Sequence, residues 1–360
     1  MIAWRHGWRW PLTVLLVFLA AGHAMLWHVS TRQLEQGFAQ WLDMQRQAGW
    51  TVEAGAPIRG GYPLSARLFV PEVRLQGLGA AIPPAIAWQA QQLTLGVAIW
   101  QPHKLIISAS GAQSLRLGSG ATLPFRADYV HLVLPLETGF PRWSLFSLAQ
   151  FHAGMALAEG TASLTVRELQ ARVDLHPAAP QGEAAISIAI KAEGIRLPDR
   201  MPADGKPWAL GPDIAALELA AHLDGPLPRL ATLDSRLTQA ASQWRDGGGL
   251  IKIERLHLRW GQLGMTSSAT LALDAQLQPM GSATLRIAGH AAGLDALVAA
   301  GLLHANAAQM AKAVATMFAT PTRDNDGEQQ VELPLSLKNR RLLLRQFAVT
   351  RLPALSWPGQ

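Results

Sequence analysis

Residues 185–191, AISIAIK, decide the fold class of this chain. Ile186, Ile188 and Ile190 alternate with small or polar residues, and a period of two is typical of a β-strand with one half-buried face. Similar stretches, separated by Gly and Pro, occur on both sides, and their connections are too short for the crossover helices that parallel strands need. We therefore expect antiparallel sheet through most of residues 51–225, including strands within 62–75, 93–100, 104–117, 125–136 and 162–175.

Two later segments have helical rather than alternating spacing. Residues 227–246 repeat apolar side chains every three or four positions, and the glycines at 247–249 should end that helix. Residues 294–318 are rich in Ala, Leu and Met and predict a helical insertion. Between them, the alternation in 250–260 changes phase near Glu254 and Arg255, which predicts a β-bulge. Residues 331–337 and 342–349 predict a final hairpin around Asn339 and Arg340.

The beginning of the chain carries an apolar run, PLTVLLVFLAAGHAMLWHV, at residues 11–29. Its 19 residues would form a helix of roughly 28 Å, close to the ~30 Å hydrocarbon core of a bilayer. The run predicts a single transmembrane helix. The alternative is a cleaved secretory signal that ends near Gly22, His23 and Ala24. Helical spacing continues to about residue 48, which favours a retained anchor.

Positive charge gives the expected orientation of this anchor. Arg5, Arg9 and the amino terminus precede the span without an acidic residue, so we expect residues 1–10 to be a cytoplasmic tail and the main domain to be periplasmic. The fold class is mainly β with α (α+β), a transmembrane helix followed by curved antiparallel sheet with helical insertions. The expected order is tail 1–10, transmembrane helix 11–29, continuing helix 30–50, first β-sheet unit 51–226, helix 227–249, and second β-sheet unit 250–360 containing the helical insertion 294–318.

Composition and motifs argue against catalysis. The chain has no cysteine, which excludes disulfides, thiolate metal sites and cysteine nucleophiles. No phosphate-binding glycine loop, nucleophile elbow or zinc-binding helix occurs, and the eleven histidines show no metal spacing. Although the net charge is +6, the basic residues are scattered, so we expect no nucleic-acid partner. We expect no enzyme, and no catalytic, cofactor-binding or metal-binding residues.

Only 16% of the residues are charged, against ~25% in ordinary soluble proteins. The share stays about the same without residues 1–29, so the deficit belongs to the β-sheet body. An apolar sheet surface for a ligand, a partner or a membrane is the expected cause. The candidate ligand-facing residues are Ile186, Ile188, Ile190, Leu271 and Leu273.

Several short motifs carry a family resemblance over essentially the whole chain. They are Gly60-Gly61-Tyr62-Pro63-Leu64, the run LHLRWGQLG at 256–264, Gly293-Leu294-Asp295-Ala296-Leu297, Leu333-Pro334-Leu335-Ser336-Leu337 and Leu352-Pro353-Ala354-Leu355. The chain resembles the bacterial envelope family called domain-of-unknown-function family 2125 and, more distantly, the AsmA-type proteins. It departs from the expected pattern at Asn339-Arg340, in place of a glycine turn, and at Gln346-Phe347, in place of Gly-Pro.

The resemblance implies a protein anchored in the inner membrane with a periplasmic β-rich domain, and the AsmA-type relatives are associated with lipid handling. Together with the missing catalytic motifs, it leads us to expect a non-enzymatic protein that binds or passes lipid or another amphiphile in envelope maintenance. One alternative is an envelope scaffold or assembly factor that binds protein partners. A second alternative is an unrecognised envelope hydrolase.

Overall fold

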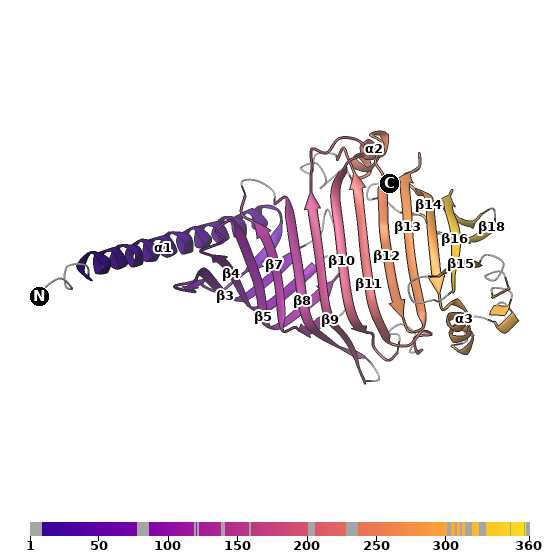
Figure 1. Cartoon of the computed structure of the whole chain (residues 1–360), viewed down its shortest axis with the longest axis horizontal. Helices are drawn as coiled ribbons and strands as arrows, with labels where there is room; N and C mark the ends of the chain where they lie inside the picture. Colours follow the sequence, from indigo (N-terminus) through magenta and orange to yellow (C-terminus); the bar gives the residue numbers. More distant parts are fainter. Residues whose placement is uncertain are drawn as a thin grey trace, which may run out of the picture. The chain divides into compact units, whose positions relative to one another are not determined.

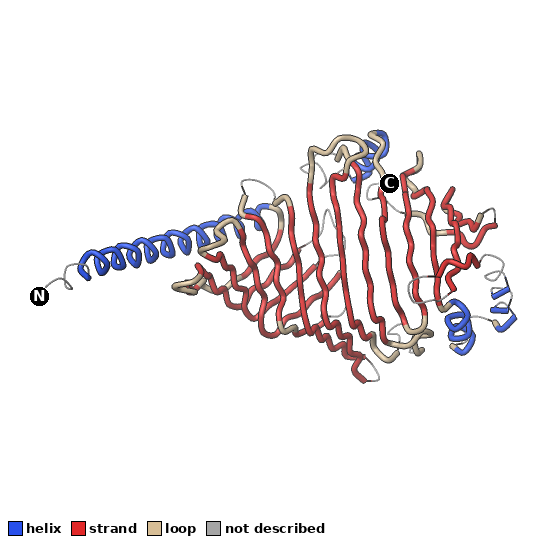
Figure 2. The backbone as a smooth tube through the Cα atoms, viewed as in Figure 1, coloured by secondary structure: helices blue, strands red, loops and turns tan. Residues whose placement is uncertain are grey.

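The structure is a computed structural model of the whole chain. It describes all residues except 1–8, 78–85, 119, 121, 138–140, 158–159, 201–205, 228–236, 301–303, 307, 310–311, 314–318, 324–328, 346, 356 and 358–360. The chain forms two compact units, residues 1–78, 84–122 and 131–141 in unit 1, and 79–83, 123–130 and 142–360 in unit 2. Figure 1 labels their elements, and Figure 2 separates helix from strand.

Unit 1 consists of a long helix and an antiparallel sheet. Its elements are α1 (Arg9–Gln47), β1 (Trp50–Glu53), β2 (Ile58–Gly60), β3 (Ser65–Gly77), β4 (Ile86–Ala98), β5 (Lys104–Leu117) and most of β7 (Tyr129–Pro135). β3 pairs with β4, and β4 with β5. β1 and β2 both pair with β3, near its end and its beginning respectively. The core includes Leu68 and Val70, which are completely buried on β3.

Helix α1 is continuous through the apolar run and beyond it, as the helical spacing predicts. Its residues from Leu12 to Gly22 are all exposed, whereas a stripe of buried and half-buried side chains begins at His23 and recurs at helical spacing. This stripe includes Trp27, Thr31 and Phe38. Apolar side chains on one helical stripe pack against a core, and the second half of α1 accordingly contacts β1 and β3.

Hydrogen bonds fix where the stripe starts on the sheet. His23 Nε2 donates to the Pro63 carbonyl at 2.6 Å, and Trp27 Nε1 donates to the Ser65 carbonyl at 3.0 Å. The Tyr62 ring makes edge contacts with both side chains, at centroid distances of 5.8 Å to His23 and 5.5 Å to Trp27. Further along, Arg59 donates to Glu35, and Arg46 donates to the Val52 carbonyl. The helix therefore runs along β3 from the turn that precedes it.

Unit 2 is a long antiparallel ladder. Its strands are β6 (Leu123–Arg126), β8 (Trp143–Leu157), β9 (Gly160–Leu175), β10 (Ala184–Arg196), β11 (Asp213–Asp224), β12 (Ile251–Trp260), β13 (Leu263–Leu273), β14 (Pro279–Ala288), β15 (Ala319–Arg323), β16 (Gln329–Lys338), β17 (Arg341–Leu344) and β18 (Phe347–Arg351). Pairing follows the chain from β8 to β14, which then pairs with β16. β17 continues from β16, and β18 from β17. Figure 1 shows β8 to β14 side by side.

The two helices of unit 2 lie at strand ends. α2 (Leu237–Asp246) sits beside the ends of β11 and β12, because Trp244 Nε1 donates to the Asp224 carbonyl at 2.8 Å. α3 (His290–Ala299) follows β14 through Gly289, and its Gly293 lies against Leu263. These helices extend the ends of the sheet rather than form a separate domain.

The structure confirms three of the sequence predictions for the sheet. Antiparallel sheet, the bulge between Ile253 and Leu256, and the Asn339-Arg340 turn are confirmed. Both turn residues have positive φ, 51° and 62°, which replaces the expected glycine turn; Gln346 lies outside the described residues.

The helix expected at 227–249 does not separate two sheets, because β11 pairs with β12 directly. Its described part is only Leu237–Asp246, and residues 228–236 lie outside the description. The units instead divide between about residues 122 and 142. The helix expected from 294 begins earlier, at His290, and much of 300–318 lies outside the described residues. Apolar periodicity marks a helix but carries no information on which strands pair across it.

Candidate functional site

Strand register shows which side chains of unit 2 share a face. Direct partners across an antiparallel ladder project to the same side, so the register traces rows across the sheet. Ile188 is paired with Val173 on one side and Ala221 on the other. The row continues through Ile253 and Ala269 on the next two strands. It reaches Ser144 on β8 and ends with Ala283, Leu335 and Leu344.

Neighbouring rows on this side are equally apolar. The row of Ile186 holds Leu175, Leu223, Ile251, Leu271, Gly281, Leu337 and Leu342; the row of Ile190 holds Phe146, Ala171, Leu219, Leu256, Ser267, Leu285 and Leu333; the row of Ala192 holds Leu148, Leu169, Leu217, Leu258, Met265, Ile287 and Val331. We call these four rows the apolar face. None of their residues carries a charge. The bulge in β12 keeps Ile251 and Ile253 on the same side as Leu256 and Leu258.

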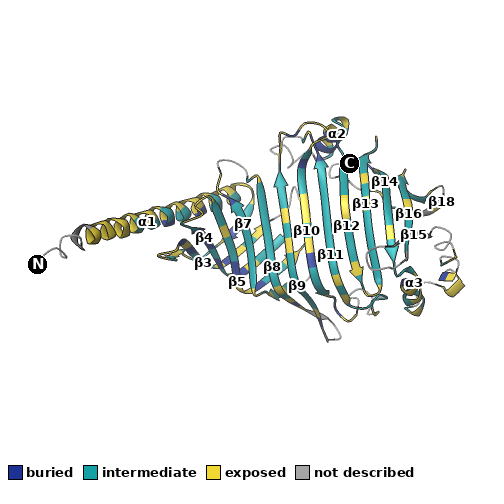
Figure 3. Cartoon of the chain, in the orientation of Figure 1, coloured by how far each residue is buried: buried dark blue, intermediate teal, exposed yellow. Residues whose placement is uncertain are grey.

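The apolar face is accessible over most of its extent. Most of its side chains are half-buried, and Figure 3 accordingly colours much of β8 to β14 as intermediate. Ile188, near the middle of the face, is 37% exposed. Ala192 and Val331, in one outer row, are the buried exceptions. Strand spacing of ~4.8 Å and a rise of ~3.4 Å per residue give the four rows dimensions of roughly 38 by 20 Å. The four rows therefore cover about 750 Å² of the sheet, and their part-exposed side chains form one contiguous apolar surface.

The opposite face is polar. The row of Lys191 holds Ser147, Gln170, Glu218, His257, Thr266, Arg286 and Glu332. Arg286 is 2.9 Å from Glu332, and Lys191 is 2.8 Å from Glu193. Hydrogen bonds from Lys191 and then Arg167 hold the pKa of Glu193 below its ordinary value. A face with exposed ion pairs is suited to water, so the two sides of the sheet have opposite chemistry.

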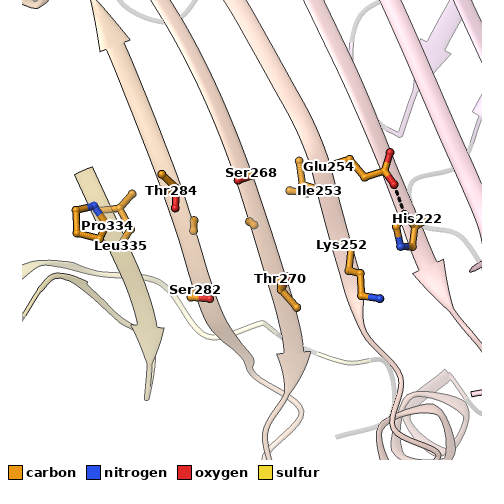
Figure 4. Close-up of a pocket in the computed structure, with 12 residues that line it drawn as sticks. His222, Lys252, Ile253, Glu254, Ser268, Thr270, Ser282, Thr284, Pro334 and Leu335 are labelled. Atoms are coloured by element: carbon orange, nitrogen blue, oxygen red, sulfur yellow. Dashed lines mark ion pairs between the residues drawn. The ribbon is translucent and has the colours of Figure 1, made fainter. Parts of the chain in front are cut away.

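A hollow on the polar face is the second place where side chains gather. Figure 4 shows His222, Lys252 and Glu254 at one end of it, with Ser and Thr hydroxyls from the next two strands further along. Lys252 Nζ is 2.9 Å from the buried carboxylate of Asp224, and His222 lies 3.4 Å from both Asp224 and Glu254. Sequence reasoning did not single out this cluster, because its members are separated by the α2 segment. Its contacts are ion pairs that hold the ends of β11 and β12 together.

Metal binding finds no support among the described residues, where no group of three or more His, Asp and Glu side chains could hold an ion. The five candidate ligand-facing residues, by contrast, come together on one side. Ile186, Ile188 and Ile190 lie on the apolar face; Leu271 is in the row of Ile186, and Leu273 is two residues further along on the same side. Sequence reasoning did not name the residues that the other strands contribute to this face, although Val331, Leu333, Leu335 and Leu337 alternate as regularly as the isoleucines of AISIAIK.

Comparison with known sequences identifies a family that covers most of the chain, including the sheet of unit 2. Residues 27–353 match a bacterial family described as uncharacterized protein conserved in bacteria, DUF2125. The chain belongs to the DUF2125 family. The match takes in the half of α1 that packs on the sheet and nearly all of unit 2. Neither the curated proteins nor the solved structures contain a match to this DUF2125 protein.

Helix α1 is long and apolar enough to cross a membrane, from length and composition alone. A signal sequence near the beginning of a chain would meet the same criterion. The stripe that starts at His23 adds a separate observation, because this part of the helix is packed into unit 1.

Proposed function

We propose that this DUF2125 protein is a non-enzymatic, membrane-anchored envelope protein that binds acyl chains of a lipid or similar amphiphile on the apolar face of unit 2. The observation that carries the proposal is the four-row apolar face, part-exposed on nine strands and backed by a polar face. Burial of each methylene against such a surface contributes ~0.8 kcal/mol, so an acyl chain gains affinity without any directional contact.

Sheet architecture supports an occupant for this face. An antiparallel sheet with one polar side normally packs its apolar side on a second layer. In the described part of unit 2, α2 and α3 lie at strand ends, and the apolar face remains half-exposed between them. A bound amphiphile would supply the missing layer.

The proposed location rests on α1. Its exposed apolar half suits a lipid environment, and residues 23–47 pack on β1 and β3, which supports an anchor retained as part of the fold. We place the chain in the inner membrane as a single-pass protein, with the amino terminus in the cytoplasm and the sheets in the periplasm. Cysteine labelling would test this, because the chain contains no cysteine of its own. A cysteine at exposed Ile58 should react with an impermeant maleimide in intact spheroplasts; protection until lysis would refute this orientation.

Native mass spectrometry of the full chain, extracted from bacterial membranes in mild detergent, tests the ligand. We expect a bound species with the mass of a phospholipid or other acyl compound, and displacement of that species by a fluorescent fatty acid. Preparations without bound lipid that also fail to take up the probe would refute acyl binding. Crosslinking in intact membranes through the apolar face then tests the occupant: reproducible protein adducts with no lipid would indicate a scaffold instead.

A further inference from the structure

We propose that the turn end of the unit 1 sheet enters the same bilayer as α1, so that the protein contacts the membrane through a helix and a β-turn tip together. The tip comprises Tyr62, Leu64 and Trp100. This inference rests on the proposed membrane anchor and adds a second membrane-binding site to it.

The tip lies beside the apolar run rather than beyond it. Pro63 and Ser65 accept hydrogen bonds from His23 and Trp27, both of which are inside the 11–29 run. Ile99 N donates to the Leu64 carbonyl at 3.4 Å, which places the β4–β5 turn and its Trp100 next to Leu64. The loops at this end of unit 1 therefore stand at the level of helix residues 23–27.

Helix length brings this level into the bilayer. The part of the run that is free of the sheet, residues 11–22, is roughly 18 Å long. A hydrocarbon core of ~30 Å needs ~20 helical residues, and counting from the residue after Arg9 and Trp10 this extends to about residue 30. The first charged residue beyond the run is Arg32. Residues 23–27 then lie inside the apolar layer by roughly 5–10 Å, and the tip must accompany them.

The side chains of the tip suit that position. Leu64 and Trp100 are each 63% exposed, and Tyr62 is 54% exposed although its ring touches α1. Three large apolar or aromatic side chains exposed at adjoining turns form a surface that water does not favour. Trp and Tyr are the residues enriched at bilayer interfaces, where an apolar ring and a polar N–H or O–H are both accommodated.

The backbone of the tip also meets the requirement of a lipid environment, where peptide groups need partners within the protein. Carbonyls of Gly61, Pro63, Leu64 and Ser65 accept hydrogen bonds from Ser65 N, His23 Nε2, Ile99 N and Trp27 Nε1. In the neighbouring turn, Gln101 N donates to the Ala98 carbonyl, and Lys104 N to the Gln101 carbonyl. His23 and Trp27 thus donate hydrogen bonds to carbonyls of this turn that would otherwise need water as a partner.

Depth-dependent quenching tests the tip. Single cysteines in the full chain at Leu64 (Leu64→Cys) and Trp100 (Trp100→Cys) would carry an environment-sensitive fluorophore in phosphatidylethanolamine–phosphatidylglycerol vesicles containing spin-labelled lipids. Phe18→Cys, in the exposed apolar half of α1, reports on the anchor itself. Met44→Cys is the matched control. Met44 is, like Leu64, an exposed apolar residue, 56% exposed, but it lies on α1 21 residues beyond His23 and therefore outside the expected span.

We expect strong quenching of Phe18→Cys by deep spin labels, at least twofold quenching of Leu64→Cys and Trp100→Cys by shallow labels, and none of Met44→Cys. Quenching of Phe18→Cys with the tip probes no different from Met44→Cys would overturn the tip and leave the anchor standing. Loss of quenching at Phe18→Cys would refute the anchor and the tip with it. Far-ultraviolet circular dichroism of each labelled variant confirms that unit 1 is folded in these comparisons.

Discussion

An aspartate placed on the apolar face should weaken acyl binding roughly 30-fold, whereas the same residue one position along the strand should not. Ile188 points to the apolar face and is 37% exposed, and its neighbour Ala189 lies on the polar face, where its row partners are Arg172 and Ala220. Ile188→Asp and Ala189→Asp add the same charge to the same strand. They differ in the side of the sheet that receives the charge and in the size of the side chain that is replaced.

The magnitude follows from the contact that is lost. A hydrated carboxylate in the middle of the face would keep two or three methylenes from packing, at ~0.8 kcal/mol each. The sum, ~2 kcal/mol, corresponds to a roughly 30-fold increase in Kd. Because Ile188 is already part-exposed, the loss of folding stability should stay below the ~3 kcal/mol of a fully buried isoleucine.

Titration of each purified variant with a fluorescent fatty acid measures Kd, and thermal unfolding without ligand reports stability. We expect weaker binding only for Ile188→Asp, with Ala189→Asp within threefold of the parent chain. Equal losses in both variants would mean that charge on the strand, rather than on the apolar face, controls binding. Unchanged binding by Ile188→Asp, with the protein folded, would refute the acyl site.

Three further predictions concern stability. Trp27→Phe removes the N–H donor to the Ser65 carbonyl but keeps a ring beside Tyr62. The free energy of unfolding of unit 1, measured by denaturant titration, should fall by ~1 kcal/mol. Trp41→Phe is the control; it keeps the stacking on Phe38 and should change the free energy of unfolding less. Gly289→Ala should clearly lower the melting temperature, because the new Cβ would lie 2.0 Å from the Gln262 carbonyl oxygen. The φ of 68° at this position is also left-handed, which alone costs an alanine ~1–2 kcal/mol. Gly264→Ala is the control and should be nearly neutral, since its Cβ would meet Ala288 at an ordinary 3.5 Å. Hydrogen bonds from Arg172 to Asp174, and from Lys191 and Arg167 to Glu193, lower the pKa of each carboxyl. The stability that these ion pairs contribute should be complete above the unfolded-state pKa of about 4 and should be lost as the pH falls through the lower folded-state pKa. Asp174→Asn and Glu193→Gln should therefore reduce the fall in melting temperature at acid pH, and an unchanged fall would contradict the assignment.

Local pattern was sufficient for some features of this chain and insufficient for others. The phase change at Glu254 and Arg255 predicts a bulge because an uninterrupted strand would send half of its apolar side chains to the wrong face, and the ladder has its register shift there. The division into sheets was not predictable in the same way. Whether β11 pairs with β12 across the α2 segment depends on contacts distant in sequence, and a helical pattern between two strands is compatible with one sheet or two.

The beginning of the helix stripe was within reach of sequence reasoning. His23, Trp27, Thr31 and Phe38 follow helical spacing, but the first two fall inside the apolar run and were therefore assigned to the membrane. Composition dominates when a window is uniformly apolar, since nothing distinguishes a lipid-facing side from a sheet-facing one. The polar atoms of His23 and Trp27 were the available signal, because both must find acceptors in an apolar layer.

The charge deficit of the chain has a structural location. In unit 2, four rows on nine strands contain no charged residue, while the intervening row of Lys191 carries acids and bases in cross-strand pairs such as Arg286 with Glu332. A low charge count spread evenly over both faces would indicate a sheet covered on both sides. Segregation of charge to one face indicates instead that only one side meets water permanently. Backbone pairing between the strands does not cover the apolar face, and a large exposed apolar surface promotes association with other molecules. This segregation is why we propose an occupant for the apolar face, and an acyl chain would cover it without requiring a single polar partner from the sheet.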